Sequence, residues 1–272
     1  MPNLTLKSVR GAVPAAFIAL AALAVGPARA ADSDFATAPA KGTISAVRLL
    51  SAGPIQGGAY RAGVEIALAP KTVTYWRQPG EAGTPPVFDF SKSTNVAKIE
   101  TAFPAPKHID EAGSVVAGYD ETVVFPLTIT PKNPKAPVTL AMRLDYAACG
   151  KICLPAKAEL SLALPQSGAS PFAATIAAAE KRVPAKIGAA EAGKRLSISK
   201  AADGAWRLSV AGPGKAQDVF AEVQEPLFIE SKSDGSAFLL TLFSAGQNPK
   251  GADATVTVVT DKGAFEAPAR LE

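Results

Sequence analysis

The 272-residue chain is poor in side chains that bind metals, because it contains two cysteines and a single histidine, His108. A structural zinc site takes about four ligands, usually cysteine and histidine. The sequence therefore excludes a zinc site built from these residues alone. Thioethers are equally scarce, since only Met1 and Met142 carry them. We expect neither a resident metal ion nor another cofactor.

Long apolar runs are missing beyond the N-terminus. Lys7 and Arg10 precede an apolar stretch of 15 residues at 11–25, which is shorter than the roughly 20 residues that a membrane-spanning helix needs. Residues 28–30 then have the small-x-small pattern of a signal-peptide cleavage site. We predict a signal peptide over residues 1–30, cleaved after Ala30, and export to the bacterial periplasm.

Clusters of basic residues are also missing. The formal net charge of +4 falls to +1 when the three cations of the signal peptide (Lys7, Arg10 and Arg29) are removed. A nucleic-acid binder normally concentrates its basic residues on one face, so we expect no nucleic-acid partner. The 48% of hydrophobic and 19% of charged residues indicate a globular core rather than a disordered chain.

Short segments rich in β-branched or alternating residues dominate the rest of the sequence. Separated by Pro and Gly, those of the first half predict strands at 45–50, 60–69, 96–103, 122–130, 138–146 and 158–164. Strands of this number and length are typical of an immunoglobulin-like sandwich.

The composition changes after residue 168. Ser170 as N-cap and Pro171 at the first helical position predict a helix over 172–182, followed by an Ala- and Gly-rich linker up to residue 194. Further strands are then predicted at 195–199, 206–210, 218–223, 227–230, 237–243, 255–260 and 264–269. The sequence thus predicts an all-β protein. Its two immunoglobulin-like β-sandwich domains (31–168 and 195–272) are joined by a short helix and linker (169–194).

The two cysteines, Cys149 and Cys153, stand four positions apart. In an extended strand they would lie roughly 13 Å apart, whereas a disulfide needs Cα atoms within about 7 Å. The chain must turn between them, and Gly150 permits this. A bridge around so short a loop contributes little stability, and short exposed bridges are often labile. A redox-active pair is therefore favoured over a structural clip, while two thiolates could also bind Cu(I) transiently.

Three cations surround the pair: Lys151 lies between the cysteines, and Arg143 and Lys157 flank them. Nearby cations favour the reactive thiolate. The same three charges would also suit a solvated surface.

Three stretches resemble one family, the periplasmic N-terminal (alpha) domain of the thiol:disulfide interchange protein DsbD. The resemblance is strongest to its ScsB-like branch, which is linked to copper tolerance. The stretches are YWRQPGEAGTPPVFDFSKSTNV at 75–96, PAPKHIDEAGSVVAGYDETVVFPLTI at 104–129 and LDYAACGKICLPAKAEL at 144–160. They lie in the segment 75–164, which is about a third of the chain and falls within the first predicted domain.

The resemblance implies an immunoglobulin-like domain that relays reducing equivalents as a component of a protein-disulfide reductase. A membrane-embedded DsbD/ScsB-like thiol reductase would reduce the pair, and the pair would reduce periplasmic thioredoxin-fold proteins. Cys149 and Cys153 match the redox cysteines. By the same analogy Cys153 attacks the partner and Cys149 resolves the mixed disulfide. Because no transmembrane or thioredoxin module follows, we expect a separate membrane partner.

The sequence departs from the family in two places. DsbD itself has more residues between its cysteines, and the family covers its pair with a cap loop that carries aromatic side chains. The corresponding residues 108–113 contain none. Supporting roles are therefore assigned to nearby side chains. Two of these are carboxylates that could accept a thiol proton or simply be solvated loop charges. The supporting candidates are Tyr75, Asp110, Glu111, Tyr119, Tyr146 and Lys151.

Two other functions compete with the redox relay. One is a non-catalytic periplasmic binding or assembly module in which the disulfide only clips a loop. The other is a copper-handling protein that uses the two thiolates.

Overall fold

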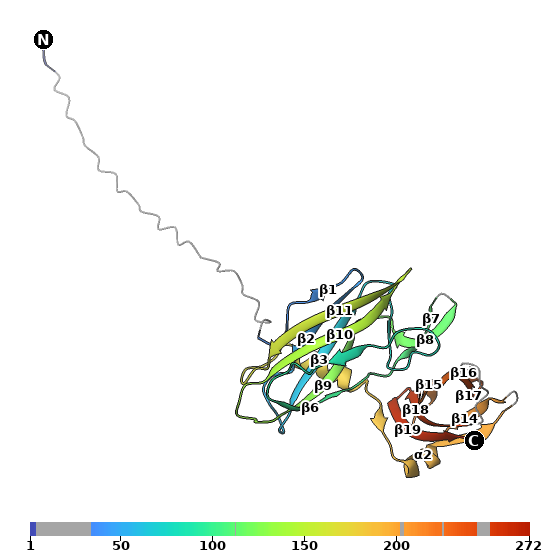
Figure 1. Ribbon diagram of the computed structural model, residues 1–272. Coiled ribbons are helices and arrows are strands. Elements are labelled where there is room, and N and C mark those ends of the chain that lie inside the picture. Colours follow the sequence, from blue (N-terminus) through green and yellow to red (C-terminus); the bar gives the residue numbers. More distant parts are fainter. Residues whose placement is uncertain (4–33, 112, 202–203, 225, 244–250) are drawn as a thin grey trace. The chain divides into compact units, whose positions relative to one another are not determined.

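Eleven strands in the described residues build the first half of the fold, and most of them pack around one hydrophobic core (Figure 1). The computed structural model describes residues 1–3, 34–111, 113–201, 204–224, 226–243 and 251–272. The predicted signal peptide and its cleavage site thus lie outside the described residues, apart from residues 1–3. Contacts along the chain join Asp32–Glu272 into one unit, which is described below.

The first sandwich, residues 36–164, consists of two antiparallel sheets and a small third one. The larger sheet has the order β1-β2-β3-β9-β6 and the facing sheet the order β11-β10-β5. The larger sheet contains β1 (Ala40–Lys41), β2 (Ser45–Ser51), β3 (Tyr60–Leu68), β9 (Val123–Pro131) and β6 (Val96–Thr101). The facing sheet contains β11 (Cys153–Ala163), β10 (Thr139–Cys149) and β5 (Val87–Asp89). The third sheet has the order β4-β8-β7, with β4 (Thr74–Tyr75), β8 (Ser114–Tyr119) and β7 (Lys107–Glu111).

Alternation along the strands explains why the two large sheets face each other. In β10, Leu140, Met142 and Leu144 are buried, while the side chains between them are half-buried or exposed. Successive side chains of a strand point to opposite faces of the sheet, so one face of β10 is apolar. That face meets Leu49 and Phe125 of the larger sheet in one core.

The second sandwich, residues 185–271, has a core of its own and consists of two four-stranded sheets. One sheet has the order β12-β19-β18-β15 and the other the order β13-β14-β17-β16. The first of these contains β12 (Ala185–Lys186), β19 (Gly263–Leu271), β18 (Ala252–Thr260) and β15 (Ala216–Val223). The second contains β13 (Leu196–Lys200), β14 (Trp206–Val210), β17 (Ala237–Phe243) and β16 (Phe228–Asp234).

The predicted helix exists, but its start differs from the prediction. Helix α1 (Ala173–Glu180) has Phe172 as N-cap, without a side-chain cap. Ser170 instead accepts a hydrogen bond from the Phe172 N–H at 3.0 Å and donates to the Ser51 carbonyl. Ser170 therefore fastens the turn that precedes the helix, and the fully buried Ile176 packs the helix against β2 and β9.

The predicted linker is more ordered than expected. It contains β12, which pairs with β19, and a second helix, α2 (Ala189–Arg195). Ala192 of α2 packs into the core of the second sandwich. Alanine-rich segments have high helix propensity, and burial of one apolar position is enough to dock such a segment.

The prediction of an all-β fold with two immunoglobulin-like sandwiches is confirmed. Each of the thirteen predicted strands overlaps an observed one, although β1, β4, β5, β7, β8 and β12 were not anticipated. The domain boundaries at residues 168 and 194 stay a prediction. Within the described ranges, no helix is long and apolar enough to cross a bilayer.

Candidate redox site

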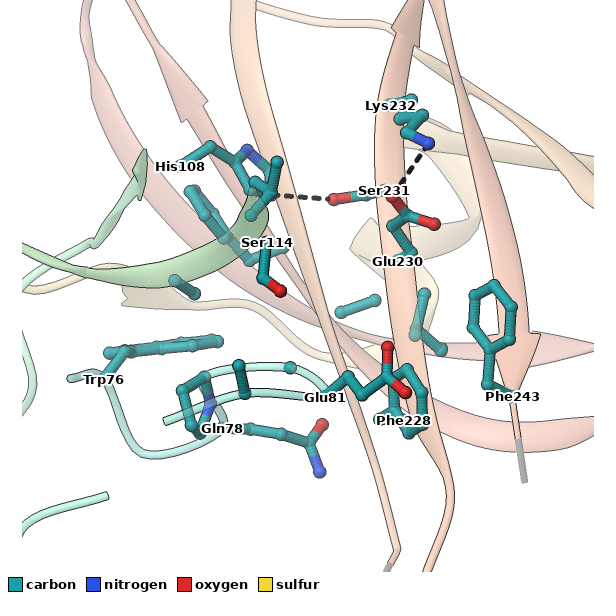
Figure 2. Close-up of a pocket in the computed structure, with 18 of the residues that line it drawn as sticks. Trp76, Gln78, Glu81, His108, Ser114, Phe228, Glu230, Ser231, Lys232 and Phe243 are labelled. Carbon is teal, nitrogen blue, oxygen red and sulfur yellow. Dashed lines mark hydrogen bonds and ion pairs between the residues drawn. The ribbon is translucent and has the colours of Figure 1, made fainter. Parts of the chain in front are cut away.

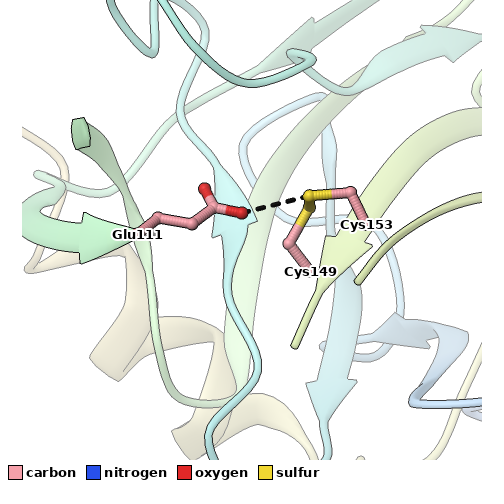
Figure 3. A group of neighbouring side chains, drawn as sticks. All are labelled: Glu111, Cys149 and Cys153. Carbon is pink, nitrogen blue, oxygen red and sulfur yellow. Dashed lines mark hydrogen bonds between the residues drawn. A yellow bond between two sulfur atoms is a disulfide. The ribbon is translucent and has the colours of Figure 1, made fainter. Parts of the chain in front are cut away.

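The cysteines lie at the end of the long hairpin that β10 and β11 form. These strands pair continuously from Thr139 and Ala163 to Cys149 and Cys153, which face each other as the last cross-strand pair. Residues 150–152 form the turn, and the two sulfurs are joined in a disulfide with Cα atoms 3.9 Å apart (Figure 3). The predicted turn between the cysteines is therefore a hairpin turn, and it presents the disulfide at the tip of the sheet.

The two sulfurs differ in accessibility. Cys149 is 2% exposed and packs with Val73, Tyr75, Val116 and Ala147. Its backbone N–H and carbonyl both bond to the backbone of Val73, at 2.9 and 2.8 Å. Cys153, by contrast, is exposed. A protein that approaches from solvent can therefore reach the sulfur of Cys153 more readily than that of Cys149.

Ile152 adds an apolar group beside the reachable sulfur. It lies in the turn between the cysteines and is 68% exposed. Single exposed apolar side chains are common on protein surfaces, but this one stands directly beside the accessible sulfur. The tip of the hairpin therefore combines a reachable sulfur with an apolar contact.

A carboxylate and a phenol meet at the disulfide. The Oε1 atom of Glu111 lies 3.1 Å from the Sγ atom of Cys153 (Figure 3). The hydroxyl of Tyr75 lies 2.7 Å from the Sγ atom of Cys149 and 2.7 Å from Oε2 of Glu111. A disulfide sulfur has no hydrogen to donate, so the contact between Glu111 and Cys153 becomes a hydrogen bond only after reduction. Reduction would thus create thiols with both a proton acceptor and a proton donor in contact.

The state of the Tyr75 hydroxyl follows from its surroundings. Burial raises the pKa of Tyr75 above its usual value, and the hydrogen bond and negative charge of Glu111 raise it further. Tyr75 therefore stays protonated throughout the neutral range and remains a hydrogen-bond donor.

The small sheet positions both residues. Glu111 is the last residue of β7, and Tyr75 ends β4, so the sheet β4-β8-β7 brings them together across β8. The stretch that corresponds to the family's cap loop, which contains no aromatic side chain, lies in the β7–β8 hairpin. We call the described part of this hairpin, residues 107–111 and 113–119, the cap hairpin. Gly113 has φ 90° at its turn, and a glycine in that region is a hairpin signal that could have revealed it.

A second glycine lets the chain close over Tyr75. A Cβ atom on Gly83 would lie 2.6 Å from the Tyr75 ring, a distance that no side chain tolerates. The loop after β4 can therefore cover the ring only with glycine at this position. Sequence reasoning missed Gly83, because its role depends on a side chain eight positions away.

The other supporting candidates have different partners. Tyr119 is buried and donates to the Pro104 carbonyl at 2.8 Å, and the Tyr146 hydroxyl lies 2.7 Å from Ser45 Oγ. Burial raises the pKa of both phenols. Asp110 accepts the N–H of Gly113 at 3.3 Å at the tip of the cap hairpin. Tyr119 and Tyr146 thus belong to the core of the first sandwich.

The three cations near the cysteines are distributed along the hairpin surface. Arg143 and Lys157 both bond to Asp145, at 2.9 and 3.2 Å. Asp145 in turn has its pKa lowered, mainly by the hydrogen bond from Arg143. Lys151 is exposed in the turn between the cysteines. It is therefore the cation of the three that lies next to the disulfide in the chain.

Comparison with known proteins finds a family that is similar to the first sandwich. Residues 46–165 match the family described as thiol:disulfide interchange protein DsbD, N-terminal. The fold resembles the crystal structure of the N-terminal periplasmic domain of ScsB from Proteus mirabilis. That similarity has a TM-score of 0.65 and 22% identity, over 88% of this chain and 99% of that one. A search of curated proteins finds no match.

The resemblance expected from the sequence is thereby confirmed, and the likeness to ScsB in fold extends beyond the matched family segment. Together with the Cys149–Cys153 pair, the family match supports a role in thiol–disulfide exchange. The chain is thus similar, over residues 46–165, to the N-terminal domain family of the thiol:disulfide interchange protein DsbD.

Proposed function

We propose that this protein relays reducing equivalents in the periplasm through Cys149 and Cys153. A membrane-embedded thiol reductase of the DsbD/ScsB type would be the source, and periplasmic thioredoxin-fold proteins would be the recipients. The observation that supports this most directly is the unequal burial of the two sulfurs. A purely structural disulfide needs no accessible sulfur. An exchange protein needs one sulfur that a partner can reach and one that is shielded.

Exchange with the partner takes place in two nucleophilic steps that conserve atoms and electrons. The thiolate of Cys153 attacks one sulfur of the partner's disulfide, forming an intermolecular S–S bond and releasing the partner's other sulfur as a thiolate, which takes up a proton. Cys149 then loses its proton and attacks the Sγ atom of Cys153, which closes the intramolecular disulfide and frees the partner's second thiol. Two electrons pass to the partner, and the membrane reductase restores the two thiols by the reverse chemistry.

Glu111 and Tyr75 are assigned to the handling of protons in this cycle. Glu111 contacts Cys153 and would accept a hydrogen bond from its thiol, so that its negative charge sets the pH at which the thiolate forms. Tyr75 contacts Cys149 and would donate a hydrogen bond to its thiolate. Lys151, in the turn, would add positive charge near both sulfurs.

Glu111→Gln is expected to move the pH profile of Cys153 reactivity to lower pH by about one unit. A carboxylate beside the sulfur opposes a second negative charge, so its removal lets the thiolate form at lower pH. The rate of alkylation of the reduced protein by iodoacetamide, followed against pH, measures this shift. Asp110→Asn is the matched control, since Asp110 lies next to Glu111 in β7 and bonds to Gly113. An unchanged or upward-shifted midpoint would contradict the role of Glu111.

Tyr75→Phe is expected to slow closure of the mixed disulfide about threefold at neutral pH and to accelerate it at alkaline pH. Loss of a hydrogen bond to a charged group, about 1.5 kcal/mol, lowers the thiolate fraction about tenfold. The more basic thiolate is also more nucleophilic, so the rate of closure falls only about threefold when the thiolate fraction falls about tenfold. Stopped-flow measurement of the release of the partner thiol at pH 7 and pH 10 tests whether the variant is slower than wild type at the first pH and faster at the second. Tyr146→Phe, which loses its bond to Ser45, should leave both rates unchanged, and equal slowing at both pH values would refute the assignment.

A redox titration tests the proposed function against the binding module with a structural disulfide. A relay needs a midpoint potential above about −300 mV, whereas a structural disulfide lies below that value. We expect a midpoint potential above that limit, together with transfer of the disulfide from an oxidised thioredoxin-fold protein to the reduced chain. A midpoint below that limit, with no transfer, would overturn the proposal.

Copper handling is a second candidate because one more ligand lies beside the sulfurs. The Sγ atoms of Cys149 and Cys153 and a carboxylate oxygen of Glu111 lie within 4.8 Å of one another. Two thiolates suit Cu(I) by their softness, but only in the reduced protein. Competition for Cu(I) with a chromophoric chelator should therefore show binding by the reduced wild type and none by the oxidised protein. Equal competition by both forms would exclude the cysteines as the site.

A further inference from the structure

Strand β15 contacts a different part of the protein with each of its faces, because successive side chains of a strand point to opposite sides. The residues at positions 219, 221 and 223 pack in the core of the second sandwich. The alternate residues Asp218, Phe220 and Glu222 contact the first sandwich. Phe220 is 2% exposed and belongs to the core cluster of the first sandwich. One face of β15 therefore holds the first sandwich.

His108 of the cap hairpin is at the centre of this contact. Its ring stacks on that of Phe220, with centroids 4.3 Å apart, and Trp76 meets Phe220 edge-on at 5.8 Å. The Nδ1 atom of His108 lies 2.9 Å from a carboxylate oxygen of Asp218, and its Nε2 atom lies 3.4 Å from the Oγ atom of Ser231 (Figure 2). His108 thus has partners on two strands of the second sandwich, β15 and β16.

Polar contacts hold the segment after β4 to the same sandwich. Arg77 donates to Glu222 of β15 at 2.6 Å and pairs with Glu266 of β19 at 3.1 Å. The two carboxylate side chains are 19% and 14% exposed. The side-chain amide of Gln78 donates to the Val223 carbonyl and accepts the Val223 N–H, both at 2.9 Å. Charge-assisted bonds that are partly buried are stronger than ion pairs on an open surface, so this segment is firmly attached.

The cap hairpin lies between the disulfide and the second sandwich. On one face of β7, Glu111 contacts Cys153, and Ile109 packs on the cluster that contains Cys149. His108 points the other way, because side chains alternate along a strand, and it meets β15. The same short strand therefore contacts the disulfide with one face and the second sandwich with the other.

The attachment of β7 within the first sandwich is weak. Among the described residues, β7 pairs with β8 alone, and β8 pairs with β4 over only two residue pairs. No side chain of β7 is buried. A strand with few buried contacts at the edge of a sheet opens locally at a low cost in free energy. The contacts of His108 with β15 are therefore the ones that can keep β7 closed over the disulfide.

We propose that His108 and Asp218 are positioning residues of the redox site. By joining the cap hairpin to β15, they keep Glu111 at the sulfur of Cys153 and keep Cys149 covered. The inference rests on the role proposed for Glu111, and it gives the second sandwich a part in the chemistry of the cysteines.

Asp218→Ala removes the hydrogen-bond partner of His108 without changing a residue of the cap hairpin. The midpoint of Cys153 alkylation by iodoacetamide should move to lower pH by about half a unit, in the same direction as in Glu111→Gln. Combined with Glu111→Gln, it should cause no further shift, because no carboxylate is left to displace. An unchanged midpoint in Asp218→Ala, or an equal further shift in the double variant, would overturn the inference.

The accessibility of Cys149 gives a second readout that does not depend on the charge of Glu111. In reduced Cys153→Ser, Cys149 is the single thiol of the chain. Adding Asp218→Ala should speed its labelling by N-ethylmaleimide about tenfold, the factor by which loss of one hydrogen bond to a charged group shifts an opening equilibrium. If Glu111→Gln itself leaves the midpoint of Cys153 unchanged, the role of Glu111 fails, and this labelling rate decides the inference. A rate equal to that of Cys153→Ser alone would refute it.

Asp253→Ala is the matched control. Asp253 also pairs with a cation of the second sandwich, Arg270 at 2.9 Å, and its side chain is 80% exposed. This variant loses the same charge and should leave both readouts unchanged. His108→Ala removes the contact from the other side and should reproduce both effects, which covers the case in which Asp218→Ala disturbs β15. Neither readout uses a partner protein, so a failure of the proposed relay, seen in the redox titration, stays distinct from a failure of this inference.

Discussion

Replacing Cys149 by serine is expected to trap the protein in a stable covalent complex with its partner. Cys153 remains able to attack the partner's disulfide, but no second thiol is present to resolve the bond. The complex should accumulate as one species, visible by mass spectrometry and on non-reducing gels, and turnover in the exchange assay should be lost. Dithiothreitol should release both proteins unchanged.

Cys153→Ser separates the roles of the two sulfurs. Cys149 is 2% exposed and hence shielded from a partner, so this variant should form little or no complex although it also has one thiol. Equal trapping by both variants would contradict the assigned order of attack. Trapping by Cys153→Ser alone would reverse it.

Phe125→Ala is expected to lower the free energy of unfolding by about 3–5 kcal/mol. Phe125 of β9 is fully buried. Its ring contacts Phe88, Phe103 and Tyr119, with centroids 5.1 to 5.4 Å away. Because Tyr119 ends β8, the same ring also joins the cap hairpin to the main core. Urea denaturation followed by tryptophan fluorescence and circular dichroism measures the loss.

Two comparisons make this prediction specific. Phe125→Leu retains most of the apolar volume and should cost less than half as much as the alanine variant. Val87→Ala, at a position 60% exposed, should change stability by no more than about 0.5 kcal/mol. Equal effects of the three substitutions would show that Phe125 is not a central core residue.

The strands could be predicted well where burial alternates with exposure. Trp206–Val210 and Ala237–Phe243 have the predicted bounds, because each is a half-buried strand that ends at turn residues. The prediction failed for β4, which has only two residues, and for β7, in which no side chain is buried and burial does not alternate. Their pairing is decided by the neighbouring strand β8.

The redox site was predicted in part. The spacing of Cys149 and Cys153 required a turn, and Tyr75 and Glu111 were among the supporting candidates. The same set also contained Tyr119 and Tyr146, whose hydroxyls bond to Pro104 and Ser45. A sequence shows which residue types lie near the cysteines along the chain. It does not show which side of a strand each of them faces after folding.

By itself, the sequence determined the local properties of this protein: an apolar N-terminal segment, alternating strands and a cysteine pair whose disulfide closes too short a loop to add much stability. Only the tertiary structure decided that Cys149 is shielded and Cys153 is reachable. It also decided that Glu111 and Tyr75, 42 and 74 positions from the cysteines they contact, meet at the disulfide. The physical reason is that burial and hydrogen bonding depend on contacts between distant segments, whereas strand alternation and loop closure depend on neighbours along the chain.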